Sequence, residues 1–337
     1  MTTLLVMGAG SVGCFVGGCS QLAGCTVHFV GRPRMLAALQ QHGMRLTDQD
    51  GLDRHLPAAQ LHLHDTPPPG LQPDLALLCV KSGATAEAAA QLAQALPAGT
   101  PVVSLQNGVG NTELARRAAP ALQWHAGMVP FNIAELSPGH VHRGTDGALA
   151  VQAQPSDAAL HAWQAALAAL PLPLKLLPDL APVQWAKLLL NLNNPVNALS
   201  GLPLRAQLLE RGYRRVLAAL QEEALDLLDA AGRPLARLTP LPPRQLVRVL
   251  RLPTWLFQRL AARMLRMDDR ARSSMADDLA LGRPTEIDAL CGEVVRLATQ
   301  LGRAAPLNAR MLALVQHWPA QPRTYTPQDL LRALGTH

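Results

Sequence analysis

The sequence predicts an α/β protein with two parts: an N-terminal parallel sheet covered by helices, and a C-terminal all-helical region. Short apolar runs such as 74–80 and 101–107 alternate with helical patterns in the first part, which is typical of buried parallel strands. From about residue 178 the alternation stops, and helical patterns follow one another with few strand candidates. We therefore place the two domains at residues 1–178 and 179–337.

The expected elements of the first part follow in chain order. The apolar run LLVMGAG is followed by the small-residue helix SVGCFVGGCSQLAG and the strand TVHFVG. The alternation continues with RMLAALQQHG (helix), DLALLCV (strand), TAEAAAQLAQALP (helix), PVVSLQN (strand) and NTELARRAA (helix). Shorter strands are expected at GMVPFNI, HVHRG and ALAVQ, and the helix DAALHAWQAALAAL is expected to close the domain. In the second part, VQWAKLLLNLNN, RRVLAALQEEALDLLDAAG and EIDALCGEVVRLATQLG have helical patterns.

Composition excludes several classes of protein. Of the 337 residues, 49% are hydrophobic and 16% charged, which indicates packed globular domains. The net charge is +6, but the basic residues are scattered and aromatic residues make up 3%, so we expect no nucleic-acid binding. A modest basic excess fits an anionic substrate or cofactor better.

The glycine-rich N-terminal segment predicts neither a membrane helix nor a secretion signal. No Lys or Arg precedes its apolar part, and glycines interrupt it repeatedly. The five cysteines lie among apolar or small residues, and no CxxC occurs. We expect buried, reduced thiols in a cytoplasmic protein.

A glycine loop follows the first strand and opens the first helix. Its residues fit G-x-G-x-x-G and are Gly8, Ala9, Gly10, Ser11, Val12 and Gly13. The first glycine permits a tight turn, the second lets the backbone approach a pyrophosphate, and the third lets helix and strand pack closely. The helix N-terminus then offers N–H donors and a positive dipole end. The sequence therefore predicts a Rossmann-type dinucleotide-binding domain.

The end of the second strand predicts which dinucleotide is bound. An NAD site usually has Asp or Glu about 20 residues after the loop, to bind the ribose 2′-hydroxyl. Here Gly31 and Arg32 occupy this place, with Arg34 close by. A guanidinium can bind a 2′-phosphate, so we expect NADP(H). The alternative is that Arg32 is a solvated turn residue.

Polar residues follow two predicted strands at the edge where a ligand would lie. Lys81 comes after the strand at 74–80, and Asn107 ends the strand at 101–107. In an open parallel sheet the ligand binds beyond the carboxyl ends of the strands. Both residues are therefore expected to face the nicotinamide end of the cofactor, although a solvated lysine after a strand is also common.

Polar residues also recur on a helix of the second part. Lys187, Asn191 and Asn194 have the spacing i, i+4 and i+7 within an apolar helix, which Pro195 is expected to end or kink. Further on, Thr285 is expected to cap a helix with Asp288 in a capping-box arrangement, which places Glu286 in the first turn. A solvated polar stripe and simple helix-terminus electrostatics are the alternatives.

A histidine pair and an apolar segment each allow more than one interpretation. His62 and His64 have strand spacing, but no third ligand has a compelling position, so we expect no metal site. The segment LPTWLFQRLAARML carries Trp255, Leu256, Phe257, Leu260 and Leu265. It is expected to be an amphipathic helix packed on its own domain, or else a homodimer surface or substrate lid.

The chain resembles the ketopantoate reductase (2-dehydropantoate 2-reductase) family over nearly its whole length. The shared motifs are GAGSVG, VKS at 80–82, QNGVG at 106–110, KLLLNLNNPVNAL at 187–199 and SSMADDLALGRPTEID at 273–288. The resemblance implies a Rossmann domain, a helical domain and a cleft between them. It also implies NADPH-dependent reduction of a 2-oxo acid in pantothenate biosynthesis.

The resemblance also implies roles for individual residues. Lys187 corresponds to the catalytic lysine that protonates the carbonyl oxygen, and Glu286 to the carboxylate on the hydroxyl side of the substrate. Lys81 and Asn107 match cofactor- and substrate-facing positions. The expected substrate-binding residues of the second part are Asn191, Asn194 and Ser274.

The sequence departs from the family pattern around the expected substrate pocket. Gly83-Ala84 stands where a glutamine is frequent, and Ala271 stands where an asparagine is usual. Asn194 falls one residue early for the second asparagine, and GMVPFNIAE replaces a threonine- and alanine-rich segment. The resemblance therefore supports the chemistry more strongly than the substrate. The alternatives are reduction of another 2-oxo or 3-hydroxy acid, or a nucleotide-binding sensor without turnover.

Overall fold

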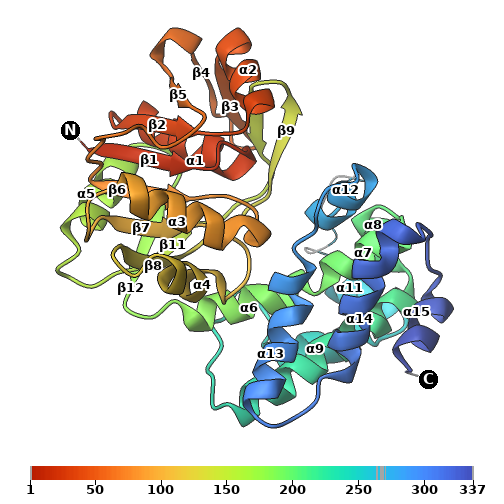
Figure 1. Cartoon of the computed structure of the whole chain (residues 1–337). Helices are drawn as coiled ribbons and strands as arrows, with labels where there is room; N and C mark the ends of the chain where they lie inside the picture. Colours follow the sequence, from red (N-terminus) through yellow and green to blue (C-terminus); the bar gives the residue numbers. More distant parts are fainter. Residues whose placement is uncertain (1, 263–264, 266–268, 270, 336–337) are drawn as a thin grey trace. The chain divides into compact units, whose positions relative to one another are not determined.

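The computed structural model describes residues 2–335 apart from 263–264, 266–268 and 270. Contacts divide the chain into two compact units, Met1–Leu180 and Ala181–His337, called unit 1 and unit 2 below. Unit 1 is α/β and the described part of unit 2 is helical, which confirms the predicted fold class (Figure 1).

Unit 1 is built on an eight-stranded sheet with the order β12-β11-β8-β7-β6-β1-β2-β5. The six strands from β5 to β8 run parallel, whereas β11 pairs with β8 antiparallel. The strands are β1 (Thr3–Met7), β2 (Thr26–Val30), β5 (His62–His64), β6 (Leu75–Leu78), β7 (Pro101–Ser104), β8 (Gln123–Met128), β11 (Leu149–Gln152) and β12 (Leu174–Leu177). This is the order expected of a dinucleotide-binding sheet, extended at one edge by β11 and β12.

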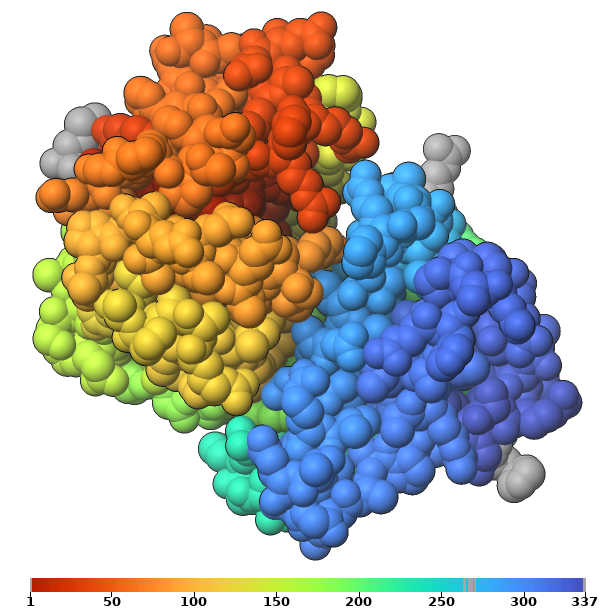
Figure 2. Space-filling view, in the orientation of Figure 1, coloured from red at the N-terminus to blue at the C-terminus, as the bar shows by residue number. Residues whose placement is uncertain are grey.

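Helices cover both faces of this sheet. They are α1 (Ser11–Leu22), α2 (Pro33–His42), α3 (Thr85–Ala95), α4 (Asn111–Ala118) and α5 (Ala158–Leu167), with short 3₁₀ turns η1 (Ala58–Gln60) and η2 (Ser82–Ala84). One core cluster joins α3 and α4 to one face, and a larger cluster joins α1 and α5 to the other. In the space-filling view, the segments containing α3 and α4 form part of the near surface of unit 1 (Figure 2). Both faces of the central strands are therefore buried from solvent.

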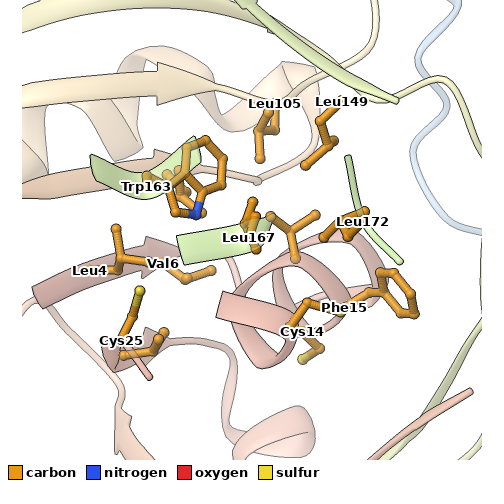
Figure 3. Packing of buried hydrophobic residues seen from close by; sticks show 14 of the residues in the cluster. Leu4, Val6, Cys14, Phe15, Cys25, Leu105, Leu149, Trp163, Leu167 and Leu172 are labelled. Carbon is orange, nitrogen blue, oxygen red and sulfur yellow. The ribbon is translucent and has the colours of Figure 1, made fainter. Parts of the chain in front are cut away.

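The larger core cluster packs α1 and α5 against the sheet. Trp163 of α5 is fully buried, and its indole N–H donates to the Ser20 hydroxyl of α1 at 2.9 Å. Figure 3 shows Trp163 and Leu167 of α5 in one cluster with Val6 of β1 and with Cys14 and Phe15 of α1. The helix α5 does not close the domain as predicted, because β12 follows it and adds an edge strand.

A second sheet of four strands was not predicted from the sequence. It has the order β4-β3-β10-β9, formed by β3 (Met44–Asp48), β4 (Asp53–Leu56), β9 (Ile133–Ser137) and β10 (His140–Arg143). Its core holds the buried Arg143, whose guanidinium donates to Asp48 at 2.7 Å and to Asp50 at 2.9 Å. Hydrogen bonding and the charge of Arg143 help to hold the pKa of Asp48 below its usual value against the effect of burial.

Unit 2 consists of helices in its described part. They are α6 (Ala181–Asn191), α7 (Asn193–Ser200), α8 (Leu204–Leu209), α9 (Arg211–Ala230), α10 (Pro243–Leu250), α11 (Thr254–Leu260), α12 (Ser274–Ala280), α13 (Cys291–Gln300), α14 (Pro306–His317) and α15 (Pro327–Leu334), with 3₁₀ turns η3 (Ile287–Ala289) and η4 (Trp318–Ala320). The long helix α9 packs against α10, α15 and α8. No described helix has the length and apolarity needed to cross a membrane.

A buried arginine ties three helices of unit 2 together. Arg214 of α9 has no exposed surface, and its guanidinium donates to the carbonyl oxygens of Leu208, Leu250 and Leu252 at 2.8–3.1 Å. These carbonyls lie at the C-terminal ends of α8 and α10, where helices leave acceptors unpaired and carry negative dipole ends. Arg214 therefore has a structural position that the sequence alone did not indicate.

The apolar segment around α11 is only partly packed. Phe257 is fully buried, whereas Trp255 is 69% exposed and Leu260 is 57% exposed. The predicted helix also included residues 263–264, which lie outside the described residues. One face of the segment packs on its own domain as expected, and the homodimer surface and the substrate lid both stay predictions.

Candidate functional site

The first glycine of the predicted nucleotide loop has a conformation that other residues adopt with strain. Gly8 has φ of +114°, and a Cβ there would lie 2.8 Å from the backbone of Cys79 and Val80. Its N–H and that of Ala9 both donate to the Val30 carbonyl oxygen, at 2.9 and 2.8 Å. The loop is therefore pressed between the ends of β2 and β6, next to Lys81.

The other two glycines differ in their surroundings. A Cβ on Gly13 would lie 2.1 Å from the Gly8 carbonyl oxygen and 2.9 Å from Val6, whereas a Cβ on Gly10 would meet nothing within 4 Å. Gly10 is the N-cap of α1 and offers no side-chain acceptor to the first turn. Ser11 and Val12 therefore lie in the first turn of a helix, and their N–H groups are accessible to an approaching anion.

The end of β2 carries the arginines expected to select the cofactor. Arg32 is exposed and is the N-cap of α2, whose first residue is Pro33. Arg34 lies 3.8 Å from the carboxylate of Glu135 in β9. The Gly31 N–H donates to the carbonyl oxygen of His64, which holds the turn against β5. Arg32 thus lies at the strand end where a ribose is bound in such domains.

Lys81 and Asn107 follow neighbouring strands, as predicted. Lys81 is exposed and precedes the 3₁₀ turn η2, while Asn107 is half-buried after β7. The two strand ends are joined by the side chain of Gln106, whose amide donates to the carbonyl oxygen of Val80 at 2.9 Å. The structure therefore places both residues at one edge of the sheet, beside the glycine loop.

In unit 2, the predicted polar stripe is interrupted. Lys187 and Asn191 both lie on α6, but this helix ends at Asn191, and Asn194 belongs to the next helix, α7. The expectation of one continuous face through Asn194 was therefore wrong. The break at Leu192 lies in the turn before Pro195, where a proline removes a helical hydrogen bond to the carbonyl four residues earlier, as expected if Pro195 ends the helix.

Helix α7 is bonded to the start of α12. The Ser273 N–H donates to the Asn197 side-chain oxygen at 2.9 Å, and the Ser273 hydroxyl donates to the Asn194 carbonyl oxygen at 3.2 Å. Ser273 also caps α12 by accepting the N–H of Ala276. Ser274, the predicted substrate-binding residue, is the exposed first residue of α12 beside this junction. Asn197 and Ser273, which connect α7 to α12, had no role predicted from the sequence.

The predicted helix start at Thr285 was wrong. Glu286 precedes the short 3₁₀ turn η3, no side-chain cap forms there, and α13 begins only at Cys291. The carboxylate of Asp288 accepts from Gln316 of α14 at 3.1 Å instead of completing a capping box. Thr285 and Asp288 therefore have the spacing of a capping box, but Asp288 makes a contact with another helix instead.

Lys187 and Glu286 interact electrostatically. Burial lowers the pKa of Lys187 to about 8, and the negative charge of Glu286 acts in the opposite direction. Glu286 is half-buried and lies just before η3. A lysine with a pKa near neutrality can donate its proton under physiological conditions, which an ordinary surface lysine does poorly.

Other clusters of polar residues lie apart from these groups. No three His, Cys, Asp or Glu side chains of the described residues are arranged to hold a metal ion. His28 and His64 are hydrogen-bonded at 3.0 Å, and His62 stacks on His28. A cavity of about 710 Å³ in unit 2 is lined by residues outside the predicted site: Arg211, Arg215, Ala219, Glu222, Glu223, Asp226, Arg251, Leu307 and Leu331.

Comparison with known proteins identifies the family to which the chain is similar. The ketopantoate reductase PanE/ApbA family matches residues 4–156, and its C-terminal family matches residues 179–318. A 2-dehydropantoate 2-reductase of Halobacterium salinarum is 27% identical, with 93% of this chain and 97% of the relative covered.

Two solved structures are similar over almost the full length. A PanE/ApbA family ketopantoate reductase from Ralstonia eutropha JMP134 is 31% identical with a TM-score of 0.79, covering 95% of this chain and 99% of that one. D-mandelate dehydrogenase, solved with NADH and anilino(oxo)acetate, shares the fold at 18% identity with a TM-score of 0.77, covering 94% and 98%. The chain belongs to the ketopantoate reductase PanE/ApbA family of nicotinamide-dependent oxidoreductases.

Proposed function

We propose that this protein reduces a 2-oxo acid with NADPH, and that its substrate is 2-dehydropantoate, which it converts to pantoate in pantothenate biosynthesis. The observation that carries the proposal is the position of Lys187 on α6, beside the buried Leu188 and Leu189 and in electrostatic interaction with Glu286, where burial lowers its pKa to about 8. A proton donor of this kind is what reduction of a carbonyl group requires.

The residues of unit 1 fit a dinucleotide. Gly10 leaves room for a diphosphate, the first turn of α1 offers N–H donors, and Gly8 and Gly13 are sites where any side chain would clash. Arg32 would bind the 2′-phosphate that distinguishes NADPH from NADH. Lys81 and Asn107, at the ends of β6 and β7, would lie toward the nicotinamide and the substrate.

The residues of unit 2 fit the proton-transfer half of the reaction. When bound, the nicotinamide supplies a hydride to the carbonyl carbon. Lys187 would stabilise the negative charge that develops on the carbonyl oxygen and donate a proton from Nζ to it. Glu286 would accept a hydrogen bond from the hydroxyl group of the substrate, with Asn191, Asn194 and Ser274 as further binding groups.

A second substrate class is kept because of specific substitutions. Gly83 is exposed and has open space where a side chain would project, and Ala271 replaces a usual asparagine before α12. Both changes remove a polar group from the expected pocket. They favour, as the alternative, a 2-oxo acid that lacks the hydroxyl group of 2-dehydropantoate. A sensor without turnover is the remaining alternative, and Lys187 argues against it.

The proposed function is tested by following NADPH oxidation with 2-dehydropantoate and a panel of 2-oxo acids with and without a hydroxyl group. We expect the highest kcat/KM with 2-dehydropantoate, and almost no turnover by Lys187→Ala. A higher kcat/KM for an acid without a hydroxyl would support the alternative substrate. Absence of turnover with every acid, despite NADPH binding, would contradict the enzymatic function.

A further inference from the structure

A group of polar side chains is buried at the carboxyl edge of β6 and β7. Thr85, Ser104, Gln106 and Asn111 are at most 8% exposed, and none was assigned a role from the sequence. Buried polar groups are costly unless they are hydrogen-bonded, so each needs a partner. The partners they have lie on either side of Lys81 and Asn107.

Gln106 joins the two strand ends. Both hydrogens of its amide nitrogen are used, one toward the Val80 carbonyl oxygen at 2.9 Å and one toward the Thr85 hydroxyl at 2.8 Å. Its side-chain oxygen accepts from the Ser104 hydroxyl at 2.9 Å. The backbone just before Lys81 is therefore fixed to the residue just before Asn107.

Thr85 fixes the backbone on the other side of Lys81. Its hydroxyl accepts the hydrogen bond from Gln106 and donates to the carbonyl oxygen of Ser82 at 2.8 Å. Thr85 is the first residue of α3 and is completely buried. The chain from Val80 to Ser82 is thus held at both ends by one connected pair of side chains.

Asn111 completes the connection on the side of Asn107. As the first residue of α4, it donates from its amide nitrogen to the Asn107 carbonyl oxygen at 2.5 Å and to the Ser82 hydroxyl at 3.2 Å. The main chain of Asn107 and the residue after Lys81 are therefore bonded to the same amide.

We propose that Gln106, Thr85 and Asn111 are positioning residues that set the mutual position of Lys81 and Asn107. This inference rests on the proposed function, in which Lys81 and Asn107 face the nicotinamide and the substrate. The three side chains act through the backbone and do not contact ligand themselves. A small displacement of groups at a reacting centre is costly, because catalysis depends on near-attack geometry.

The chain offers a matched control for this proposal. Thr100, just before β7 at the opposite end of the strand, is 6% exposed, and its hydroxyl donates to the Pro97 carbonyl oxygen at 2.7 Å. Thr85 makes the same bond, to a carbonyl three residues earlier, at 2.8 Å. Replacing either threonine by valine removes one buried hydroxyl and one local hydrogen bond, but only Thr85 is connected to Gln106.

The experiment compares Thr85→Val, Thr85→Ser and Thr100→Val with the full-length wild type. Melting temperature, NADPH dissociation constant, and kcat and KM with the best 2-oxo acid are measured for each. We expect both valine variants to lower the melting temperature, and Thr85→Val to lower it more, because it also leaves one Gln106 N–H unpaired. Only Thr85→Val should also lower kcat by about tenfold or more, and Thr85→Ser, which keeps the hydroxyl, should restore most of it.

The outcomes separate this proposal from the proposed function. If the wild type turns over and the two valine variants have equal kcat, the network is structural only and the positioning role is wrong. If the wild type reduces no 2-oxo acid, the proposed function fails, and the NADPH dissociation constants decide the positioning role. An unchanged dissociation constant in Thr85→Val would then overturn it. Should Thr85→Val fail to fold, Gln106→Met, which keeps the approximate size of the side chain without adding a buried charge, replaces it.

Discussion

The two units offer different kinds of group to the proposed reaction. In unit 1 the loop Gly8–Gly13 offers backbone N–H groups and carries no charged side chain. In unit 2 the proposed chemistry depends on two titratable side chains, Lys187 and Glu286, on separate elements. The loop of unit 1 is therefore sensitive to an added atom at Gly8 or Gly13, and unit 2 to the loss of one functional group.

The largest effect is expected from removing the amine of Lys187. Lys187→Ala should lower kcat by roughly 10²–10⁴, the usual contribution of general acid catalysis, with little change in NADPH affinity. Steady-state kinetics and a fluorescence titration with NADPH check this. Near-normal turnover would show that another group donates the proton.

Two substitutions in the glycine loop of unit 1 should separate an effect on protein stability from an effect on cofactor binding. Gly13→Ala places a Cβ within 2.1 Å of the Gly8 carbonyl oxygen and should lower the free energy of unfolding by about 1–3 kcal/mol or more. Gly10→Ala has no such clash and should change it by less than about 1 kcal/mol, while weakening NADPH because the methyl group occupies the phosphate approach. Denaturant unfolding and cofactor titration test both. Equal losses of stability would refute the distinction.

Glu286 should affect one class of substrate. Glu286→Ala is expected to lower kcat/KM by about 10–100-fold for a hydroxylated 2-oxo acid, since a hydrogen bond to a charged group contributes about 1.5–3 kcal/mol. An acid without the hydroxyl should lose much less. Parallel assays with the two acids decide, and identical losses would leave Glu286 as an electrostatic neighbour of Lys187 only.

The pH profile should follow Lys187. Because the protonated amine is the active form and its pKa is about 8, kcat/KM for reduction should fall about tenfold per pH unit above that value. Lys187→Arg keeps its charge at all these pH values and should lose this alkaline limb, at a lower rate overall. An unchanged limb in Lys187→Arg would assign the titration to a different group.

The smallest effect is expected at the cofactor end. Arg32→Ala should reduce the preference for NADPH over NADH by about tenfold, since one charge-assisted interaction with the 2′-phosphate is lost. NADH binding should stay almost unchanged and serves as the internal control. A wild type that prefers NADH would contradict the assignment of Arg32.

The sequence allowed the main sheet and the helical unit to be predicted because their apolar patterns are strong and regular. It did not reveal the four-stranded sheet, since β4 carries the exposed polar residues Asp53, Arg54 and His55, which resemble a loop. The α11 segment was ambiguous for a related reason. From the sequence alone, it is not possible to tell which of its apolar residues pack against the rest of the chain and which stay exposed.

The candidate site was predictable where a motif has one physical meaning. The glycine loop was such a case, because its residue spacing follows from the needs of a phosphate-binding turn. The region around Glu286 was not, because Thr285 and Asp288 have the spacing of a helix cap but make no cap. Gln106, Thr85 and Asn111 could not be assigned either, since polar residues after strands are usually solvated and only their burial distinguishes them.

The cysteines have a consequence for the handling of the protein. Burial raises the pKa of Cys14 and Cys19 to about 12 and also raises the pKa of Cys25, Cys79 and Cys291. At pH 7 only about one Cys14 thiol in 10⁵ is then a thiolate, the form that reacts with alkylating reagents and peroxides. We therefore expect the buried thiols of the native chain to react slowly with such reagents. A single cysteine introduced on the exposed surface can be modified with a fluorophore without first removing the natural ones.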